Sequence, residues 1–546
     1  MSDNTHQRSE TNVTLVDTSP ESPRTATDFT KNGSSSTSET IIPPEHPYRT
    51  LVLCFDGTGD QFDSDNSNIV EFFTLLKKDD RSQQMVYYQA GIGTYTTPQI
   101  ATPFMAKISK TLDEMIAWNL DSHVMGGYEF LMQNYTVGDR ICIFGFSRGA
   151  YTARSLAGMI HKVGILPACN HQQVPFAYKM YTRTDEVGWQ QSNAFKKAFS
   201  IDADIEFVGV WDTVNSVGLI PKRLPFTTSN NNVHTFRHAV SLDERRAKFK
   251  ANLWNRPTEH EAKLGLRHKF HRHGEGEACQ ETNETPKKRP QNLKPGHSTN
   301  TLRALERKFG SQVATVVGLC PPFHVPRPID RRMKSDVGGG SVSNDTKPNL
   351  ARIPLRWMIR ECFKTNTGIM FDADLLRDIG MDPDCLYPNV LPRPPALPVG
   401  SGHFIRNIPT SSSTSQTQRE MALQNYSSGD LTATAVSDRR PTEEELELAD
   451  ALSPVYDQLS LAWFWWILEF FPIRIRYQHG DNSWANYFGW NLGRGRVIPK
   501  QRTQGVKVHR SVKMRMEATY ENGGRYVPKA SFDESFILRI LFYDER

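Results

Sequence analysis

The feature that most constrains this chain is the stretch 140–164, RICIFGFSRGAYTARSLAGMIHKVG. It opens with an apolar run at 141–144 that suits a buried strand, and apolar residues at helical spacing follow from Ala150. Between the two lies a G-x-S-x-G turn with Ser147 at its centre. On so sharp a strand-to-helix turn, larger flanking residues would collide with the neighbouring strand and helix. The stretch predicts that Ser147 is a nucleophile, with an ordinary glycine-rich turn as the alternative.

Other segments of the chain repeat the pattern of a strand followed by a helix. Residues 48–55, 85–88 and 205–211 are short apolar runs typical of strands, and long helical patterns cover 69–76 and 104–134. Strands alternating with helices, with polar residues at the strand ends, predict an α/β fold with a doubly wound, mostly parallel sheet. The stretch 238–246 is expected to form a helix at the rim of the site.

Composition divides the chain into ordered and disordered parts. A mean hydropathy of −0.53 over 546 residues is low for a wholly compact enzyme. The segments 1–46 and 386–445 are rich in Ser, Thr and Pro and predict a disordered tail and a disordered loop. The α/β domain is expected at 47–372 with an insertion at about 255–312, and the aromatic-rich segment 454–546 is expected to pack on this core.

Charge and cysteine usage exclude several classes of protein. A net charge of +5, not gathered into one stripe, argues against a nucleic-acid-binding protein. The seven cysteines are scattered without a C-x-x-C pair, which favours reduced thiols and a cytoplasmic protein. The histidines of 255–312 lack the fixed spacing of metal ligands, so we expect a solvated insertion and neither a metal nor a cofactor.

Two strand ends near the serine offer the partners that a nucleophile needs. Asp212 ends the strand 205–211 and is the natural acid to orient a catalytic base, with helix capping as the alternative role. The backbone N–H of Arg148 would donate to the oxyanion. A second donor is expected from Gly57 or Thr58 in the glycine-rich loop after the first strand.

The same loop also raises a rival interpretation. Asp56 begins an Asp-Gly-Thr run, and aspartyl-phosphate phosphatases open with D-x-D-G-T after a strand, where the first Asp attacks. Here Cys54 holds that position, so the phosphatase mechanism lacks its attacking group. We therefore expect Asp56 to order the loop through hydrogen bonds.

Five motifs in fixed order resemble a known family: LVLCFDGTG at 51–59, GFSRGA at 145–150, VGVWDTV at 208–214, HAVSLDERR at 238–246 and DVGGG at 336–340. Together they resemble a widespread, largely uncharacterised α/β-hydrolase domain family. It includes the catalytic domain of bacterial type VI secretion phospholipase effectors and many fungal members. The resemblance implies an α/β-hydrolase-type fold and a serine hydrolase that acts on ester bonds, in characterised members those of phospholipids.

The resemblance also assigns residues. It matches Ser147 to the family's nucleophile and Asp212 to its acid, and places Asp336 and Gly338 in the site loop. The expected substrate is accordingly a lipid or another ester, and the reaction would be phospholipase- or lipase-like, through an acyl-enzyme on Ser147.

One departure from the family pattern concerns the catalytic base. The family usually has H-x-D-V-G-G-G, whereas this chain has Lys334 in place of the histidine, and the preceding segment 310–335 is atypical for the expected strand. A lysine with an ordinary pKa near 10.4 is protonated at neutral pH. Three interpretations remain: another histidine serves, with His509 or His238 as candidates; the segment is translated intron; or the protein is a catalytically inactive module for binding or interaction.

A tryptophan-rich stretch lies late in the chain, at 459–472. It is too short to span a membrane and contains Glu469. We expect a buried helix, and a peripheral contact with a membrane surface is the alternative, because tryptophan suits both settings.

Overall fold

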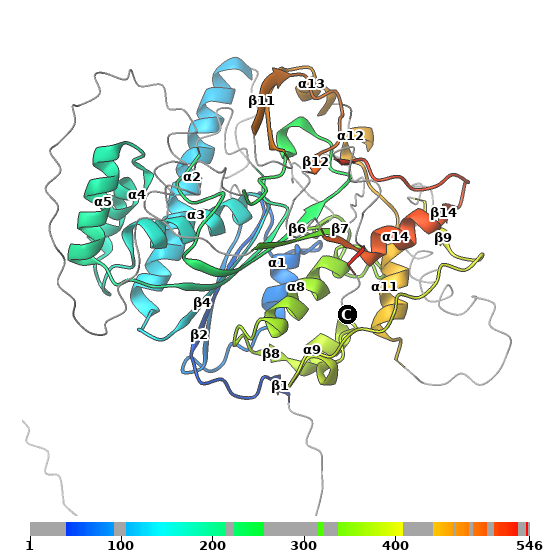
Figure 1. Ribbon diagram of the computed structural model, residues 1–546, viewed down its shortest axis with the longest axis horizontal. Helices are drawn as coiled ribbons and strands as arrows, with labels where there is room; N and C mark the ends of the chain where they lie inside the picture. Colours follow the sequence, from blue (N-terminus) through cyan, green and yellow to red (C-terminus); the bar gives the residue numbers. More distant parts are fainter. Residues whose placement is uncertain are drawn as a thin grey trace, which may run out of the picture. The chain divides into compact units, whose positions relative to one another are not determined.

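The computed structural model describes residues 40–91, 105–214, 223–255, 315–320, 337–407, 440–461, 463, 465–479, 484–498, 507–532 and 542–543. At its centre is an eight-stranded sheet in which all neighbouring strands run parallel (Figure 1). The strands in spatial order are β3 (Gln84–Gln89), β2 (Thr50–Phe55), β4 (Arg140–Phe146), β5 (Ile205–Trp211), β6 (Val233–Ser241), β7 (Thr315–Cys320), β13 (Lys507–His509) and β16 (Phe542–Tyr543).

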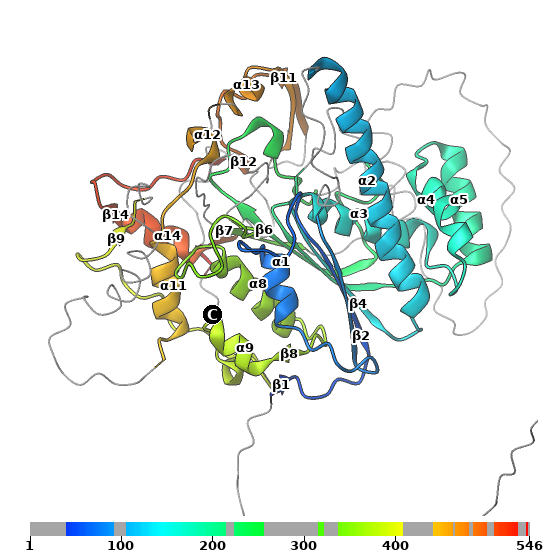
Figure 2. The same cartoon turned by 180° about the vertical axis from the view of Figure 1, so that it is seen from behind.

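Helices cover both faces of this sheet (Figures 1 and 2). The alternation of side chains along β2 shows why. Leu51 and Leu53 face one core with α2 (Met105–Asn134) and α3 (Ser147–Val163), whereas Val52 and Cys54 face a second core with α1 (Asn68–Thr74) and α8 (Arg352–Lys364). Strands buried on both faces must be apolar throughout, as β2 and β4 are. The predicted doubly wound α/β fold is confirmed.

The fold also contains helices and four two-stranded sheets besides the central sheet. The helices are α1 (Asn68–Thr74), α2 (Met105–Asn134), α3 (Ser147–Val163), α4 (Val174–Thr182), α5 (Glu186–Phe199), α8 (Arg352–Lys364), α9 (Ala373–Asp378), α11 (Glu443–Ala451), α12 (Gln458–Leu461), α13 (Trp465–Glu469) and α14 (Arg510–Glu517). Four two-stranded sheets pair β1 (Ile41–Ile42) with β8 (Phe371–Asp372), β10 (Ile473–Gln478) with β11 (Trp484–Gly489), β12 (Val497–Ile498) with β15 (Ser531–Phe532), and β9 (Phe404–Ile405) with β14 (Thr519–Tyr520).

Two sequence expectations near the site need correction. Residues 238–246 were expected to form a helix, but Val233–Ser241 is strand β6, paired with β5 along its length, and a turn follows it. Residues 238–241 of this strand are all buried, so the strand lacks the alternation of apolar and polar residues by which a half-buried strand is recognised. The atypical segment 310–335 does contain a strand, because β7 joins β6 to β13 in the central sheet.

The C-terminal part of the chain is built into the sheet as well as packed on it. It contributes β13 and β16 to the edge beyond β7. The flanks of the segment 386–445, predicted to be disordered, have a defined structure at 386–407 and 440–445, where buried Arg393 pairs with Glu447 at 2.5 Å. The predicted tail up to residue 39, most of the insertion at 255–312 and the stretch 408–439 lie outside the described residues.

Candidate active site

Ser147 lies where β4 meets α3, in the backbone conformation that the sequence motif predicted. Its φ of 54° falls in the left-handed region, which is costly for a residue with a side chain. The flanking glycines permit this turn, since a Cβ on Gly145 would come within 2.5 Å of the Gly149 carbonyl oxygen. A Cβ on Gly149 would lie 2.3 Å from the carbonyl oxygens of Phe55 and Asp56. The helix α3 can therefore begin this close to the end of β2 only with glycine here.

Asp56 orders the loop after β2 through three short hydrogen bonds. Its Oδ1 accepts from the Gly57 N–H at 2.7 Å and from Ser67 Oγ at 2.6 Å, and its Oδ2 accepts from Tyr88 Oη at 2.8 Å. Burial raises the pKa of Asp56 to about 6, although the three donors oppose the shift. The Gly57 N–H, a candidate oxyanion donor, is thus engaged by the neighbouring carboxylate.

Two glycine-rich loops meet on the ring of Phe146, the residue before Ser147. A Cβ on Gly57 would strike Cδ1 of this ring at 2.6 Å, and one on Gly338 would strike Cε2 at 1.8 Å, on the opposite edge. The second loop is tied to the N-terminus of α1, where the Asn68 N–H donates to the Gly338 carbonyl oxygen at 2.6 Å. The first, second and fifth sequence motifs therefore converge beside Ser147. Asp336 and Lys334 lie outside the described residues.

Asp212 follows β5 as Ser147 follows β4. Phe146 and Trp211 are register partners on these neighbouring strands, so the two residues that come next leave the sheet at the same level. Asp212 has a φ of 47°, again in the left-handed region. Its Oδ1 accepts from the Ser241 N–H at 3.2 Å, and both carboxylate oxygens accept from the guanidinium of Arg496. The carboxylate is buried and paired with a cation from the C-terminal part of the chain.

The two candidate histidines lie apart from Ser147. His238 is fully buried on β6, where its Nε2 accepts from the Thr213 N–H at 3.1 Å and burial holds its pKa well below the ordinary value. His509 ends β13, four strands from β4 or about 19 Å at the usual spacing. Its Nε2 lies 3.5 Å from Glu447, and its Nδ1 lies 2.9 Å from Ser511 Oγ. Among the described residues, no hydrogen bond joins a histidine to Ser147.

Sequence reasoning missed three residues that shape the site. Ser67 caps α1 and donates to Asp56; the run Asn-Ser-Asn before an apolar helix carries the signal of such a cap. Tyr88 donates to Asp56 from the neighbouring strand β3, and register alone could have placed it. Arg496 carries no local signal, because it lies 284 residues from Asp212.

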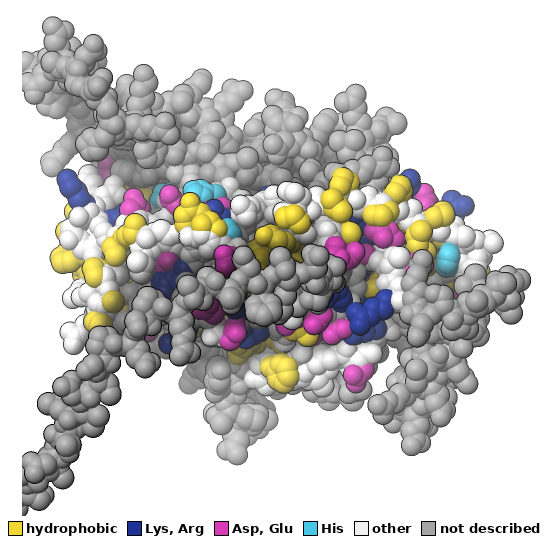
Figure 3. Space-filling view, turned by 90° about the horizontal axis from the view of Figure 1, so that it is seen from below, with side chains coloured by type: hydrophobic (Ala, Val, Ile, Leu, Met, Phe, Trp, Pro, Cys, Tyr) yellow, Lys and Arg dark blue, Asp and Glu magenta, His cyan; other side chains and the backbone are white. Residues whose placement is uncertain are grey.

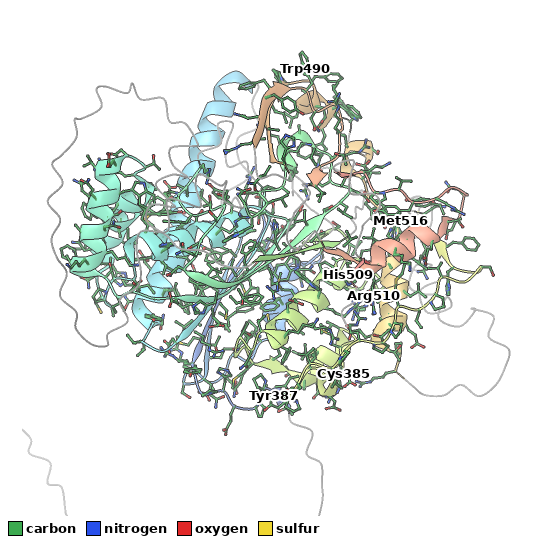
Figure 4. The ribbon with its side chains drawn as sticks, in the orientation of Figure 1. Cys385, Tyr387, Trp490, His509, Arg510 and Met516 are labelled. Carbon is green, nitrogen blue, oxygen red and sulfur yellow. The ribbon has the colours of Figure 1, made fainter. Side chains whose placement is uncertain are left out.

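The tryptophan-rich segment does not form the expected buried helix. The helix α13 has only five residues, and large apolar side chains around it face outward: Trp463 is 77% exposed and Phe488 is 76% exposed. Their neighbour Trp490 lies at the outer edge of β11 (Figure 4). We call this group the aromatic surface; it comprises Trp463, Ile467, Phe470, Phe471, Tyr487, Phe488 and Trp490. Buried Glu469 explains the charge within the apolar stretch, since it accepts from the Ala247 N–H and from Asn491 Nδ2, both at 2.5 Å.

Comparison with known proteins identifies the family. Residues 49–361, more than half of the chain, match the family described as "T6SS, Phospholipase effector Tle1-like, catalytic domain". The chain belongs to the Tle1-like family. At the level of the family it is a phospholipase- or lipase-like hydrolase domain, as the sequence motifs predicted.

Relatives of this Tle1-like chain include an uncharacterized protein, YEL023C, from Saccharomyces cerevisiae (strain ATCC 204508 / S288c). It is 29% identical over 575 residues, covering 90% of this chain and 82% of the relative. An uncharacterized protein from Pseudomonas aeruginosa of known crystal structure is 16% identical, with a TM-score of 0.30, covering 74% of this chain and 53% of the other. The Tle1 effector bound to the VgrG spike is 17% identical, with a TM-score of 0.22, covering 39% and 48%. The chain thus spans about half the length of these two solved structures.

Two kinds of feature are absent from the described residues. None of their helices has both the length and the apolar character that crossing a membrane requires. Within the same part of the Tle1-like chain, no group of three or more His, Cys, Asp or Glu side chains is placed to hold a metal ion.

Proposed function

We propose that this Tle1-like chain is a serine hydrolase of lipid ester bonds. The observation that carries the proposal is the placement of Ser147 and Asp212. Both residues have a left-handed backbone conformation, and they follow the ends of neighbouring strands at the same level. Ser147 Oγ would attack the acyl carbonyl, its proton would pass to a base, and the alcohol would leave to give an acyl-enzyme that water hydrolyses. Asp212, whose carboxylate is paired with the Arg496 guanidinium, would orient that base.

The oxyanion would be bound by two groups at this junction. The N–H of Arg148 follows Ser147 directly in the first turn of α3, the position from which a nucleophile elbow supplies an oxyanion donor. For the second donor, the geometry favours Thr58 over Gly57. The Gly57 N–H already donates to Asp56, whereas Thr58 Oγ1 is buried and has no hydrogen-bond partner among the described residues. We therefore propose Thr58 as the second oxyanion donor.

The base that accepts the proton of Ser147 is one of several histidines, and mutagenesis can identify which one. His238 and His509 were the candidates from sequence, and each ring is held by other groups, Thr213 for the first and Ser511 for the second. Replacing each by Gln, together with His324 in the segment after β7, would identify the base. We expect loss of labelling by a serine-directed probe in one variant alone.

A fluorophosphonate probe tests the proposal itself. We expect it to label the folded wild-type chain on Ser147, and labelling should disappear in S147A. Ser155 offers a matched control on the same helix, because its buried Oγ only donates to the Tyr151 carbonyl oxygen at 2.8 Å, and S155A should still be labelled. A folded wild-type chain without labelling would favour the alternative function, a catalytically inactive binding module.

We also propose that the aromatic surface contacts a phospholipid bilayer. Trp and Tyr favour the membrane interface, and here they are exposed together with Phe. By contrast, the face of the molecule seen in Figure 3 carries hydrophobic side chains interspersed with acidic and basic ones. The buried Glu469 carboxylate joins this surface to the turn after β6, because it accepts from the N–H groups of Ala247 and Gly493.

Vesicle binding tests this contact. The triple variant W463A/F488A/W490A should lose most of its sedimentation with phosphatidylcholine vesicles, because three exposed rings no longer enter the interface. The matched control is F62A/F199A, which removes two exposed rings outside the aromatic surface, and its binding should equal that of the wild-type chain. Unchanged sedimentation of the folded triple variant would exclude the contact.

A further inference from the structure

Arg496 makes every hydrogen bond that a guanidinium can make, and Asp212 receives two of them. Its Nη1 donates to Asp212 Oδ1 and to the Ser241 carbonyl oxygen at 2.9 Å. Its Nη2 donates to Asp212 Oδ2 at 3.0 Å and to the Phe249 carbonyl oxygen at 2.6 Å, and its Nε donates to the same carbonyl at 3.2 Å. A guanidinium has five N–H donors, so all of them are used. The side chain is 2% exposed.

The backbone around Arg496 is fixed as firmly as its side chain. The Ser531 N–H donates to the Arg496 carbonyl oxygen at 2.8 Å, where β12 pairs with β15. A Cβ on Gly495 would lie 1.9 Å from the carbonyl oxygen of Lys529, so these two segments touch. On the other side, Lys250 Nζ donates to the Arg494 carbonyl oxygen at 3.1 Å. The C-terminal segments thus hold Arg496 against the turn that follows β6.

We propose that Arg496 is the positioning residue of the site: it fixes the Asp212 carboxylate in the orientation that a catalytic base requires. The inference rests on the serine-hydrolase function proposed above and extends it. The residue lies outside 49–361, the part of the chain that matches the family, so the hydrolase domain is completed by its own C-terminal region. The bidentate geometry explains the residue type, since a guanidinium matches both carboxylate oxygens at once and an ammonium group does not.

The geometry indicates that Arg496 contacts Asp212 permanently and is not an inhibitory contact that opens to release the site. Withdrawing Arg496 would leave buried acceptors on Asp212, Ser241 and Phe249 without their donor, and unpaired buried groups are costly. An inhibitory contact would instead need a bond that opens readily. Removing Arg496 should therefore slow the reaction of Ser147, whereas removing an inhibitory contact would speed it.

The test measures the rate constant of fluorophosphonate labelling per folded molecule in the full chain. We expect R496M to lower it by about 100-fold, the effect of a displaced catalytic group. R496K, which keeps the charge but loses the bidentate fit, should fall between R496M and the wild type. With a soluble ester substrate, kcat should fall in the same order while KM stays unchanged, because Arg496 would act only through Asp212.

Two further variants separate positioning from damage to the fold. In the D212N background R496M should cause little additional slowing, since the function of Asp212 is already lost. R356M removes another buried arginine from a buried aspartate, Asp450 at 2.7 Å, and should leave the rate per folded molecule unchanged. An R496M chain labelled at the wild-type rate would overturn the inference and leave the proposed function standing. The inference would also be overturned if R356M slowed labelling as much as R496M does, or if R496M slowed the D212N chain as much as it slows the wild type. An unlabelled wild-type chain would overturn both proposals.

Discussion

Two buried aspartates stand at the same edge of the sheet, and they are stabilised in opposite ways. Asp56 follows β2 and is held by neutral donors: a hydroxyl on α1, a phenol on β3 and a backbone N–H. Asp212 follows β5 and is held by a guanidinium with both of its oxygens. The neutral donors leave the cost of burial dominant at Asp56, whose pKa is raised to about 6. A full positive charge faces the other carboxylate.

The difference shows where each part of the site comes from. The partners of Asp56 are 11 and 32 residues away, within the segment that matches the Tle1-like family. The partner of Asp212 is 284 residues away, in the C-terminal region. The loop beside Ser147 is thus ordered by local elements, whereas the candidate acid depends on the complete chain. Substitutions at the partners of Asp56 and of Asp212 can therefore test the two arrangements separately.

The largest effect is expected from breaking the charged pair on one side only. R496M should lower the free energy of unfolding by about 3–5 kcal/mol, because it leaves the Asp212 carboxylate buried without a cation. The double variant D212N/R496M should be more stable than R496M, since no uncompensated charge remains. Chemical denaturation of the wild type, R496M, D212N and the double variant measures this coupling. Equal stabilities of R496M and the double variant would show that the pair contributes no specific energy.

The next effect is the pH dependence that follows from Asp56. Its pKa is raised to about 6 in the folded chain, against an ordinary value of 3.8. Below the unfolded value both states are protonated and the stabilising contribution is complete; as the pH rises through 6, the folded chain must release a proton at a buried site. The free energy of unfolding should therefore fall, relative to D56N, by about 2 kcal/mol between pH 4 and pH 7, mainly where the unfolded chain is ionised and the folded chain is still protonated. Parallel pH curves for the two chains would contradict the assignment.

The same contrast explains how far sequence reasoning reached. The turn at Ser147 and the strand before Asp212 carry local patterns, an apolar run followed by small or acidic residues, and both were placed correctly. No pattern announces Arg496, because its partner is distant in sequence and the pairing exists only in the folded chain. The prediction of a buried helix at 459–472 failed for a different reason. A run of apolar residues has the same composition whether its side chains are buried or exposed. Only the fold shows that Trp463 faces outward.

A smaller effect is expected from removing the hydroxyl of Ser67. This side chain caps α1 by accepting from the N–H groups of Ile69 and Val70, and it donates to Asp56. S67A should lower the free energy of unfolding by about 1–2 kcal/mol and raise the pKa of Asp56 further, because it deletes a donor to the ionised form. The control S82A removes an exposed serine that bonds only Asp80. An Asp56 pKa unmoved in S67A would mean that this bond does not favour the anion.

The smallest effect is expected from Tyr88, whose phenol donates to Asp56 Oδ2 at 2.8 Å from the neighbouring strand. Y88F keeps the ring and its packing on Phe73, so only the hydrogen bond is lost, at a cost of about 1 kcal/mol. The pKa of Asp56, followed by the carboxyl carbon resonance, should rise, as in S67A, and Y48F at an exposed tyrosine should leave it unchanged. If S67A and Y88F shift the pKa while R496M does not, the two aspartates are held independently. A shift in R496M would instead show that the charged pair extends its influence across the strands between them.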